Sequence, residues 1–206
     1  MIAIVDYGAG NVRSVQKALT HVGASARLTA DAAEIRAASH VVFPGQGHFG
    51  QAMAQLRATG LDAALRDVVA QHTPFLGICL GLQLLFDASD EAPGVAGLGI
   101  LRGRCERFAP PQKVPQIGWN PIVATRPSAV LDPVLAARHD HVYFVHSFHV
   151  RAADPSDVVA VADYGGPFTA AVQRDTLFAA QFHPEKSGQA GLALLRSWLA
   201  NGGVAC

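Results

Sequence analysis

The segment 75–81 constrains the fold of this chain more than any other. Residues 75–78 read as a buried β-strand, and they lead directly into Cys79, which has Gly77 and Gly81 on its two sides. Glycines at this spacing are typical of a sharp strand-to-helix turn, because a neighbouring Cβ would obstruct both the bent backbone and an approaching substrate. The segment therefore predicts a strand, a turn that presents the Cys79 thiol, and a helix over residues 80–87.

A second segment, His183-Pro184-Glu185, supplies the groups that a cysteine nucleophile needs. In extended backbone the side chains of residues 183 and 185 share one face, so the carboxylate can orient the imidazole while the imidazole faces the thiol. Each segment alone has a commoner explanation, a buried structural cysteine in one case and a surface turn in the other. Their occurrence in one chain favours a catalytic triad of Cys79, His183 and Glu185.

The remaining elements predict an α/β fold. In the first half, strands are expected at residues 1–5, 25–29, 41–43 and 75–78, with helices at 12–21, 49–58 and 61–71. This alternation predicts a doubly wound, mostly parallel sheet flanked by helices on both faces. The second half is β-rich, with expected strands at 100–108, 117–124, 142–150, 158–162, 169–173 and 177–182 before a helix at 188–199. A chain of 206 residues without a visible linker is expected to form a single domain, residues 1–206.

Composition narrows the classes of function. The 16 basic and 16 acidic residues are dispersed and give a formal net charge of zero, so neither nucleic acid nor an anionic membrane is an expected partner. No apolar run is long enough to span a bilayer and the first residues begin a strand without a basic leader, which favours a soluble, cytoplasmic protein.

The spacing of the cysteines and glycines predicts neither a metal site nor a cofactor. The cysteines lack paired spacing, and Cys105 and Cys206 are interpreted as bystanders. No metal site is expected, because no cluster of His, Asp and Glu has ligand spacing. No cofactor is expected either, because the glycine-rich turn at 6–11 lacks a full dinucleotide-binding fingerprint.

Further candidate residues lie where strands end. Ligands bind outside the carboxyl ends of parallel strands, and the turn at 6–11, the segment 44–47 and Cys79 all fall at that edge. The backbone N–H of Leu80 is expected to be one oxyanion donor, and the glycine-containing segment 44–47 is the natural source of a second. Gln83 lies one helical turn beyond Cys79 and can hold the polar end of a substrate, although its spacing equally fits a solvent-facing side chain.

With these residues the chain resembles the class I, or triad, glutamine amidotransferases, which split glutamine and pass ammonia to a synthase. The closer resemblance is carried by DYGAGN at 6–11, PGQG at 44–47, PQIGWN at 115–120, YFVHS at 143–147 and HPEKS at 183–187. Within the family these segments are similar to the glutaminase subunits of histidine biosynthesis, and the likeness covers essentially the whole chain. Gln46 and Gln116 depart from the family pattern, which usually has a small apolar residue at the first position and more often His or another residue at the second.

The resemblance implies a reaction and the residues that perform it. His183 draws the proton from Cys79, the thiolate attacks the γ-carboxamide of glutamine, His183 protonates the departing ammonia, and water hydrolyses the glutamyl thioester. The implied oxyanion hole consists of Leu80, Gln46 and Gly47, and the implied glutamine-binding residues are Gly45, Gly47, Gln83, His146, Ser147 and Phe148. By residue type alone, His146 and His149 are more typical of hydrogen-bonded structural histidines.

The resemblance also implies a protein partner. Ammonia in bulk water at neutral pH would become ammonium and lose its nucleophilicity, so it must pass directly to a second active site. The family supplies that site in a (β/α)8 cyclase subunit, and the residues implied to face it are Asn11, Trp119, Tyr143 and Lys186. From the sequence alone, a single aromatic residue in a β-rich segment is more often part of the core.

Three alternatives stay open at this point. The chain could be the glutaminase of another synthase, such as the one that makes pyridoxal phosphate, or a stand-alone γ-glutamyl hydrolase. It could also be a catalytically idle regulatory subunit that keeps the fold. The intact triad speaks against an idle subunit, and glutaminase assays with and without a cyclase distinguish these cases.

Overall fold

The structure is a computed structural model that describes residues 1–8 and 11–201. Its centre is an eight-stranded sheet with the strand order β2-β1-β3-β4-β13-β12-β11-β8. The strands from β2 to β13 in that order run parallel, and β12, β11 and β8 are added by antiparallel pairing. The bounds are β1 (Ile2–Val5), β2 (Ala26–Thr29), β3 (His40–Gly45), β4 (Phe75–Cys79), β8 (Val123–Ala124), β11 (Val158–Asp163), β12 (Pro167–Arg174) and β13 (Leu177–Ala180). The expected doubly wound, mostly parallel sheet is confirmed.

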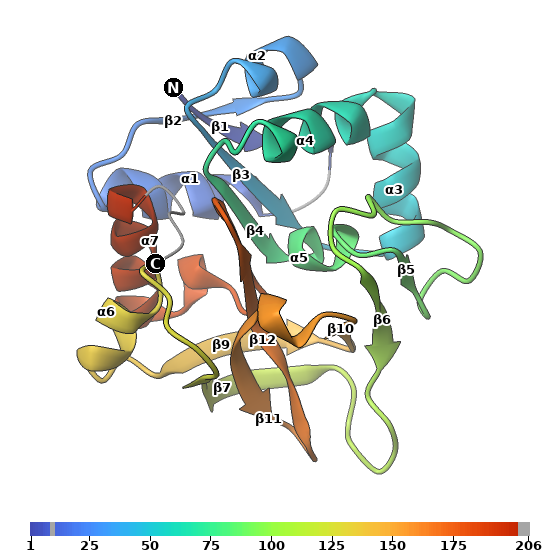
Figure 1. Ribbon diagram of the computed structural model, residues 1–206, viewed down its shortest axis with the longest axis vertical. Helices are drawn as coiled ribbons and strands as arrows, with labels where there is room; N and C mark the ends of the chain where they lie inside the picture. The colour runs from blue at the N-terminus through green and yellow to red at the C-terminus, as the bar shows by residue number, and fades with distance from the viewer. Residues whose placement is uncertain (9–10, 202–206) are drawn as a thin grey trace.

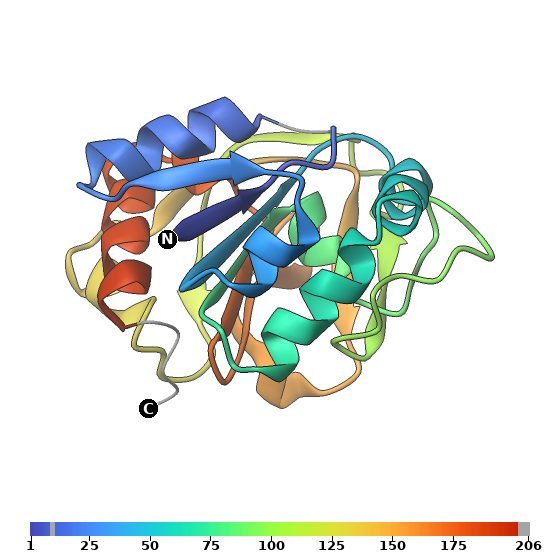
Figure 2. The same ribbon diagram turned by 90° about the horizontal axis from the view of Figure 1, so that it is seen from above.

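Helices cover both faces of this sheet, as Figures 1 and 2 show. One face carries α1 (Val12–His21) and α7 (Gly188–Asn201), and the other carries α2 (Ala32–Arg36), α3 (Phe49–Ala58) and α4 (Leu61–Ala70). Along β3, Val41 and Phe43 pack with the core residues of α3 and α4, whereas Val42 packs with those of α1 and α7. Because both faces are covered, the central strands are apolar throughout instead of alternating with polar residues.

The β-rich half forms two smaller sheets beside the main one. The first contains β10 (Phe148–Ala152), β6 (Gly103–Arg107) and β5 (Ala88–Ser89), and the second contains β7 (Gln116–Pro121) and β9 (His141–His146). The single strand expected at 142–150 is wrong, because β9 pairs with β7 while β10 pairs with β6, and the chain bends at Ser147 between the two sheets. The strand expected at 117–124 likewise divides into β7 and β8.

The helix after Cys79 is shorter than expected. Residues 80–87 were expected to be helical, but α5 spans only Leu80–Leu84. The N–H of Asp87 donates to the carbonyl of Gly103 at 3.1 Å, and the carbonyl of Leu84 accepts from the N–H of Leu98 at 2.8 Å, so later segments of the chain pair with groups that a helix over residues 80–87 would use. None of the helices within the described ranges is both long and apolar enough to cross a membrane.

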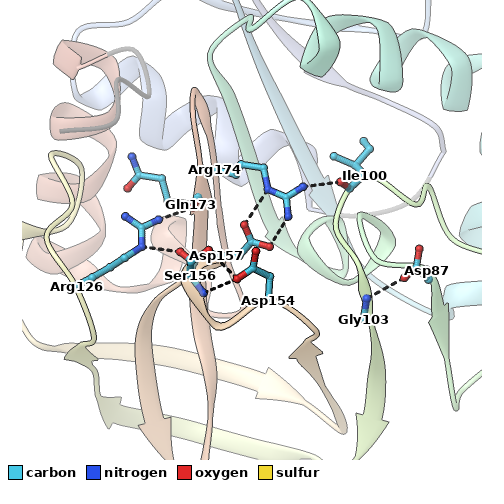
Figure 3. A network of polar contacts seen from close by, with 9 residues as sticks. All are labelled: Asp87, Ile100, Gly103, Arg126, Asp154, Ser156, Asp157, Gln173 and Arg174. Atoms are coloured by element: carbon cyan, nitrogen blue, oxygen red, sulfur yellow. Dashed lines mark hydrogen bonds and ion pairs between the residues drawn. The ribbon is translucent and has the colours of Figure 1, made fainter.

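Arg174 connects the antiparallel part of the main sheet to the loop after α5 (Figure 3). Arg174 at the end of β12 donates from Nε and Nη2 to the two carboxylate oxygens of Asp157, at 2.8 and 2.5 Å. Asp157 lies in the short helix η1 (Pro155–Asp157) and is buried. A third nitrogen of Arg174 donates to the carbonyl of Ile100 at 3.2 Å. Two-point contacts between charged groups are among the stronger polar interactions in proteins, and this one joins β12 to η1. The hydrogen bond to Ile100 holds the loop after α5 against β12.

Candidate active site

Cys79 occupies a strained turn between β4 and α5. Its φ of 55° and ψ of −110° lie in a region that residues with a side chain rarely adopt. The glycines on either side are required by close contacts: a Cβ at Gly81 would lie 1.9 Å from the carbonyl oxygen of Phe43, and one at Gly77 would lie 2.8 Å from the Cβ of Ala179. Backbone strain persists only where the surroundings over-determine the conformation, and it is concentrated at functional sites.

His183 and Glu185 follow the strand next to β4. Because β13 runs parallel to β4 with Ala180 opposite Ile78, the chain leaves β13 at the same edge of the sheet as Cys79. The imidazole Nδ1 of His183 lies 2.8 Å from Oε1 of Glu185, and both side chains are only 2% exposed. The geometry differs from the expectation in one respect. His183 is extended, but Glu185 lies in the 3₁₀ helix η2 (Pro184–Lys186), and its carboxylate still reaches the ring from there.

The surroundings make the His183 imidazole a strong base. Burial alone would lower its pKa, but the interactions with Cys79 and Glu185 outweigh burial and raise the pKa to about 10. The second ring nitrogen, Nε2, is buried and has no hydrogen-bond partner of ordinary geometry among the described residues. It is therefore available to exchange a proton with Cys79, the sulfur that contributes to the raised pKa.

A cavity of about 380 Å³ opens over Cys79, which is within the size range of small-ligand sites. Ten of the residues singled out from the sequence line it: Gln46, Gly47, Cys79, Leu80, Gln83, His146, Ser147, Phe148, His183 and Lys186. Three further lining residues were not expected: Glu91, Pro115 and Val145. Glu185 lies behind His183 and outside the cavity. The structure therefore brings together segments from both halves of the chain at one site.

Gln83 is buried, so the solvent-facing alternative is wrong. Its Nε2 donates to the carbonyl of Phe148 at 2.8 Å and to Oε1 of Gln181 at 3.1 Å. Gln181 in turn places its own Nε2 3.7 Å from the sulfur of Cys79. Sequence reasoning missed Gln181, which is fully buried; a glutamine inside the apolar run 177–182 was the signal that could have identified it.

His146 is a neutral histidine at the edge of the cavity. Burial lowers its pKa to about 4, and the hydrogen bond to the carbonyl of Phe148 only partly offsets that effect. Since the ring is neutral and Nδ1 lies 2.9 Å from that carbonyl oxygen, Nδ1 carries the proton and Nε2 is an acceptor. The aromatic rings of Phe108, Phe144 and Phe168 pack around it. His146 thus has the hydrogen-bonded structural setting expected from its residue type, while it also lines the cavity.

The segment after β3 lies directly opposite the cysteine turn. Gly45 pairs with Cys79 across β3 and β4, and a Cβ at Gly45 would lie 2.7 Å from the backbone nitrogen of Gly81. Gly45 supports the turn and does not line the cavity, unlike Gln46 and Gly47. Gly47 has a φ of 96°, and no atom of the described residues lies within 4 Å of the position that a Cβ would occupy there. The segment is therefore closely packed at Gly45 and open at Gly47.

The residues implied to face a partner fall into two places. Trp119 on β7 is 54% exposed and lies edge-on to Tyr143, with a centroid distance of 6.1 Å. The ammonium group of Lys186 lies 5.9 Å from the centre of the Tyr143 ring. Asn11 precedes the first residue of α1, where it lines a small cavity together with Glu185. Of the two other cysteines, Cys105 is buried, and Cys206 lies outside the described residues.

The parallel sheet, the strained cysteine turn and the adjacent histidine–carboxylate pair define the class of protein. The chain belongs to the class I glutamine amidotransferases: the model of the family described as "Glutamine amidotransferase class-I" matches residues 3–201. The resemblance stated from the sequence is confirmed.

Relatives that match along nearly their full length show which members of the family this chain is similar to. The chain is 47% identical to the imidazole glycerol phosphate synthase subunit HisH of Deinococcus radiodurans over 199 residues, which cover 96% of this chain and 92% of that relative. It is also 47% identical to the subunit of the same name from Methanothermobacter thermautotrophicus over 201 residues, which cover 97% of this chain and 98% of that relative. Both names describe a component of a complex.

Solved structures share the fold at low sequence identity. A crystal structure of a glutamine amidotransferase matches with a TM-score of 0.76 at 20% identity and covers 98% of this chain and 99% of that one. PurLQS from Thermotoga maritima matches with a TM-score of 0.70 at 15% identity and covers 97% of each chain. At these identities the likeness concerns the fold alone.

Proposed function

We propose that this chain is the glutaminase subunit of an imidazole glycerol phosphate synthase in histidine biosynthesis. It hydrolyses glutamine to glutamate and ammonia and delivers the ammonia to a cyclase subunit, which makes imidazole glycerol phosphate and an aminoimidazole carboxamide ribotide. The observation that carries the proposal is the 47% identity with HisH subunits along nearly the whole of both chains. The alternatives of another synthase and of an idle subunit are not favoured by that likeness.

In this proposal Cys79, His183 and Glu185 form the catalytic triad. His183 takes the thiol proton, and the sulfur attacks the γ-carboxamide carbon of glutamine to give a tetrahedral intermediate. His183 returns the proton to the departing nitrogen, ammonia leaves, and water then hydrolyses the thioester to glutamate and the free thiol. Glu185 holds the imidazole in orientation through the 2.8 Å contact at Nδ1. The raised pKa of His183 supports its role as the proton acceptor.

The oxyanion is assigned to backbone donors. The first donor is the backbone N–H of Leu80, the first residue of α5, directly after Cys79. The second is a backbone N–H of the segment Gly45–Gly47. We infer that this segment turns between two orientations, because Gly47 has open space around it and a φ that only glycine adopts readily. The isolated chain is then a slow glutaminase, and docking of the partner turns the peptide toward the oxyanion.

Glutamine is assigned to the cavity over Cys79, with Gly47, Gln83, His146, Ser147 and Phe148 as its lining and Gly45 as backbone support. Both hydrogen bonds that the Gln83 side chain makes within the described ranges use its Nε2. Its Oε1 is therefore the atom suited to accept a hydrogen bond from the α-ammonium group of the substrate.

The partner is assigned as a (β/α)8 cyclase that forms a heterodimer with this chain. Ammonia is protonated in neutral water, so its delivery requires a docked second active site. Ile117 and Trp119 on β7 are exposed apolar side chains, 64% and 54% respectively. Lys186 lies beside Tyr143, whose ring packs on Trp119, and it lines the active-site cavity. Exposed aromatic and apolar side chains with a cation beside them are typical of protein interfaces. A single domain and a cytoplasmic location belong to the same proposal.

The test is reconstitution with a (β/α)8 cyclase and its nucleotide substrate. Product formation from glutamine, at a rate matched by glutamate release, is expected for the complex. Product formation from ammonium salts but not from glutamine would contradict the assignment as glutaminase. Glutamine hydrolysis at a rate that the cyclase does not change would favour a stand-alone hydrolase. Stimulation of glutamine hydrolysis only by a different synthase would favour the glutaminase subunit of that synthase.

A further inference from the structure

Tyr7 carries a buried hydroxyl that nothing in the described part of the chain satisfies. The residue follows β1 and is 2% exposed, and its hydroxyl oxygen has no hydrogen-bond partner among residues 1–8 and 11–201. Buried hydroxyls in proteins nearly always have a partner, because an unpaired one retains the cost of losing water. Even the hydroxyl of Tyr164, a residue that is only half-buried, has a partner, since it donates to the carbonyl of Lys113 at 2.8 Å. The unpaired group at Tyr7 therefore needs an explanation.

The hydroxyl of Tyr7 lies against the oxyanion segment. A Cβ at Gly45 would come within 2.9 Å of its oxygen, so the glycine makes the room that the hydroxyl occupies. The Tyr7 ring packs on Phe43 of β3 at a centroid distance of 5.7 Å, which fixes its position. Burial, assisted by the nearby charge of Cys79, raises the pKa of Tyr7, so the hydroxyl keeps its proton and can donate it in a hydrogen bond.

The segment that follows Gly45 separates two cavities. Gln46 lines the active-site cavity on one side, and on the other it lines a cavity of about 350 Å³ together with Tyr7, His48, Gln51 and Gln55. In a trans peptide the N–H and the C=O point in opposite directions. A loop peptide that turns its N–H toward Cys79 must therefore turn its carbonyl oxygen toward the side on which Tyr7 lies.

We propose that Tyr7 is a positioning residue for the oxyanion segment: its hydroxyl donates a hydrogen bond to the loop carbonyl that turns away from Cys79 in the active orientation. In the orientation described by the structure the hydroxyl has no partner among residues 1–8 and 11–201, so the proposed active orientation adds a contact that this one lacks. This inference rests on the proposed glutaminase function and adds a residue that stabilises one orientation of the loop.

The test is Tyr7→Phe, which keeps the ring and removes the hydroxyl, with Tyr164→Phe as the matched control. Because the removed group is unpaired at rest, the melting temperature of isolated Tyr7→Phe is expected to be unchanged or higher. In the complex with cyclase, its glutaminase kcat is expected to fall about 3- to 10-fold with little change in KM, as for the loss of one hydrogen bond. Synthesis from ammonium salts is expected to stay at the wild-type rate, and Tyr164→Phe is expected to keep the wild-type kcat.

Two results would overturn the inference. A wild-type kcat for Tyr7→Phe in an active complex would show that the hydroxyl does not act on the loop. A lower melting temperature for the isolated variant would show that the hydroxyl is already paired at rest. Failure of the proposed function has a different signature: the wild-type complex itself would use ammonium salts and not glutamine, and the role of Tyr7 would fall with it.

Discussion

The two glycine-containing segments beside Cys79 differ in how firmly their surroundings hold them. At Gly81 an added Cβ would lie 1.9 Å from a backbone oxygen, whereas at Gly47 no atom in the described part of the chain lies within 4 Å of that position. The turn that carries the nucleophile is thus packed in one conformation, and the segment proposed to supply an oxyanion donor is open on one side. Removal of one such donor lowers turnover about 100- to 1000-fold. Under the proposed function, this difference means that the reacting side chains are fixed and that control lies in the backbone opposite them.

The largest effect is expected at the nucleophile itself. Cys79→Ala removes the sulfur that attacks glutamine, so glutamine-dependent synthesis by the complex should be abolished. Synthesis from added ammonium salts should continue, because the cyclase site is intact. Both activities are measured on the reconstituted complex, and residual glutamine-dependent turnover above background would show that Cys79 is not the nucleophile.

Gly81→Ala and Gly47→Ala compare the packed and the open segment directly. Alanine at 81 clashes with backbone that cannot move aside, and we expect the free energy of unfolding to fall by about 3 kcal/mol or more. Alanine at 47 meets no atom, so only its positive φ is penalised, by about 1–2 kcal/mol. Urea unfolding of the isolated variants measures both values. Equal losses at the two positions would contradict the difference in packing.

Glu185→Gln tests whether the carboxylate only orients the imidazole. Glu185 is one of the groups that raise the pKa of His183 to about 10, so its removal should lower that pKa and the ring should lose its proton at a lower pH. The loss of glutaminase activity should be smaller than for His183→Ala, because the base remains. NMR titration of the His183 ring and the pH dependence of kcat check these expectations. A loss as large as that of His183→Ala would assign Glu185 a further role.

The smallest effect on the isolated chain is expected at the proposed interface. Trp119 is 54% exposed, so Trp119→Ala should leave the melting temperature nearly unchanged and weaken association with the cyclase by about 10-fold or more. Lys186→Ala should act in the same direction. Arg36→Ala is the control, since it removes a cation from α2 on the other face of the sheet. Calorimetric titration with cyclase gives the affinities, and unchanged binding by both interface variants would contradict the assignment.

Features encoded locally were predictable from the sequence. The strand leading to Cys79, its flanking glycines and the alternation of strands and helices all depend on neighbouring residues, and the structure has them. The contact from Gln181 to Cys79, the buried position of Gln83 and the unpaired hydroxyl of Tyr7 depend on which strands lie side by side, so spacing could not reveal them. The bend at Ser147 was missed because its cause is the separate pairing of β9 and β10. The roles of the site residues stay predictions.

The central claim is that a fixed triad is controlled by a movable backbone segment, and steady-state glutamine hydrolysis tests it most directly. The rate is measured for the chain alone, for its complex with the cyclase, and for the complex with the cyclase's nucleotide substrate bound. We expect the chain alone to be slower than the fully loaded complex by about 100-fold or more, as for the loss of one oxyanion donor, with the complex without nucleotide in between. Equal rates in all three states would contradict the claim.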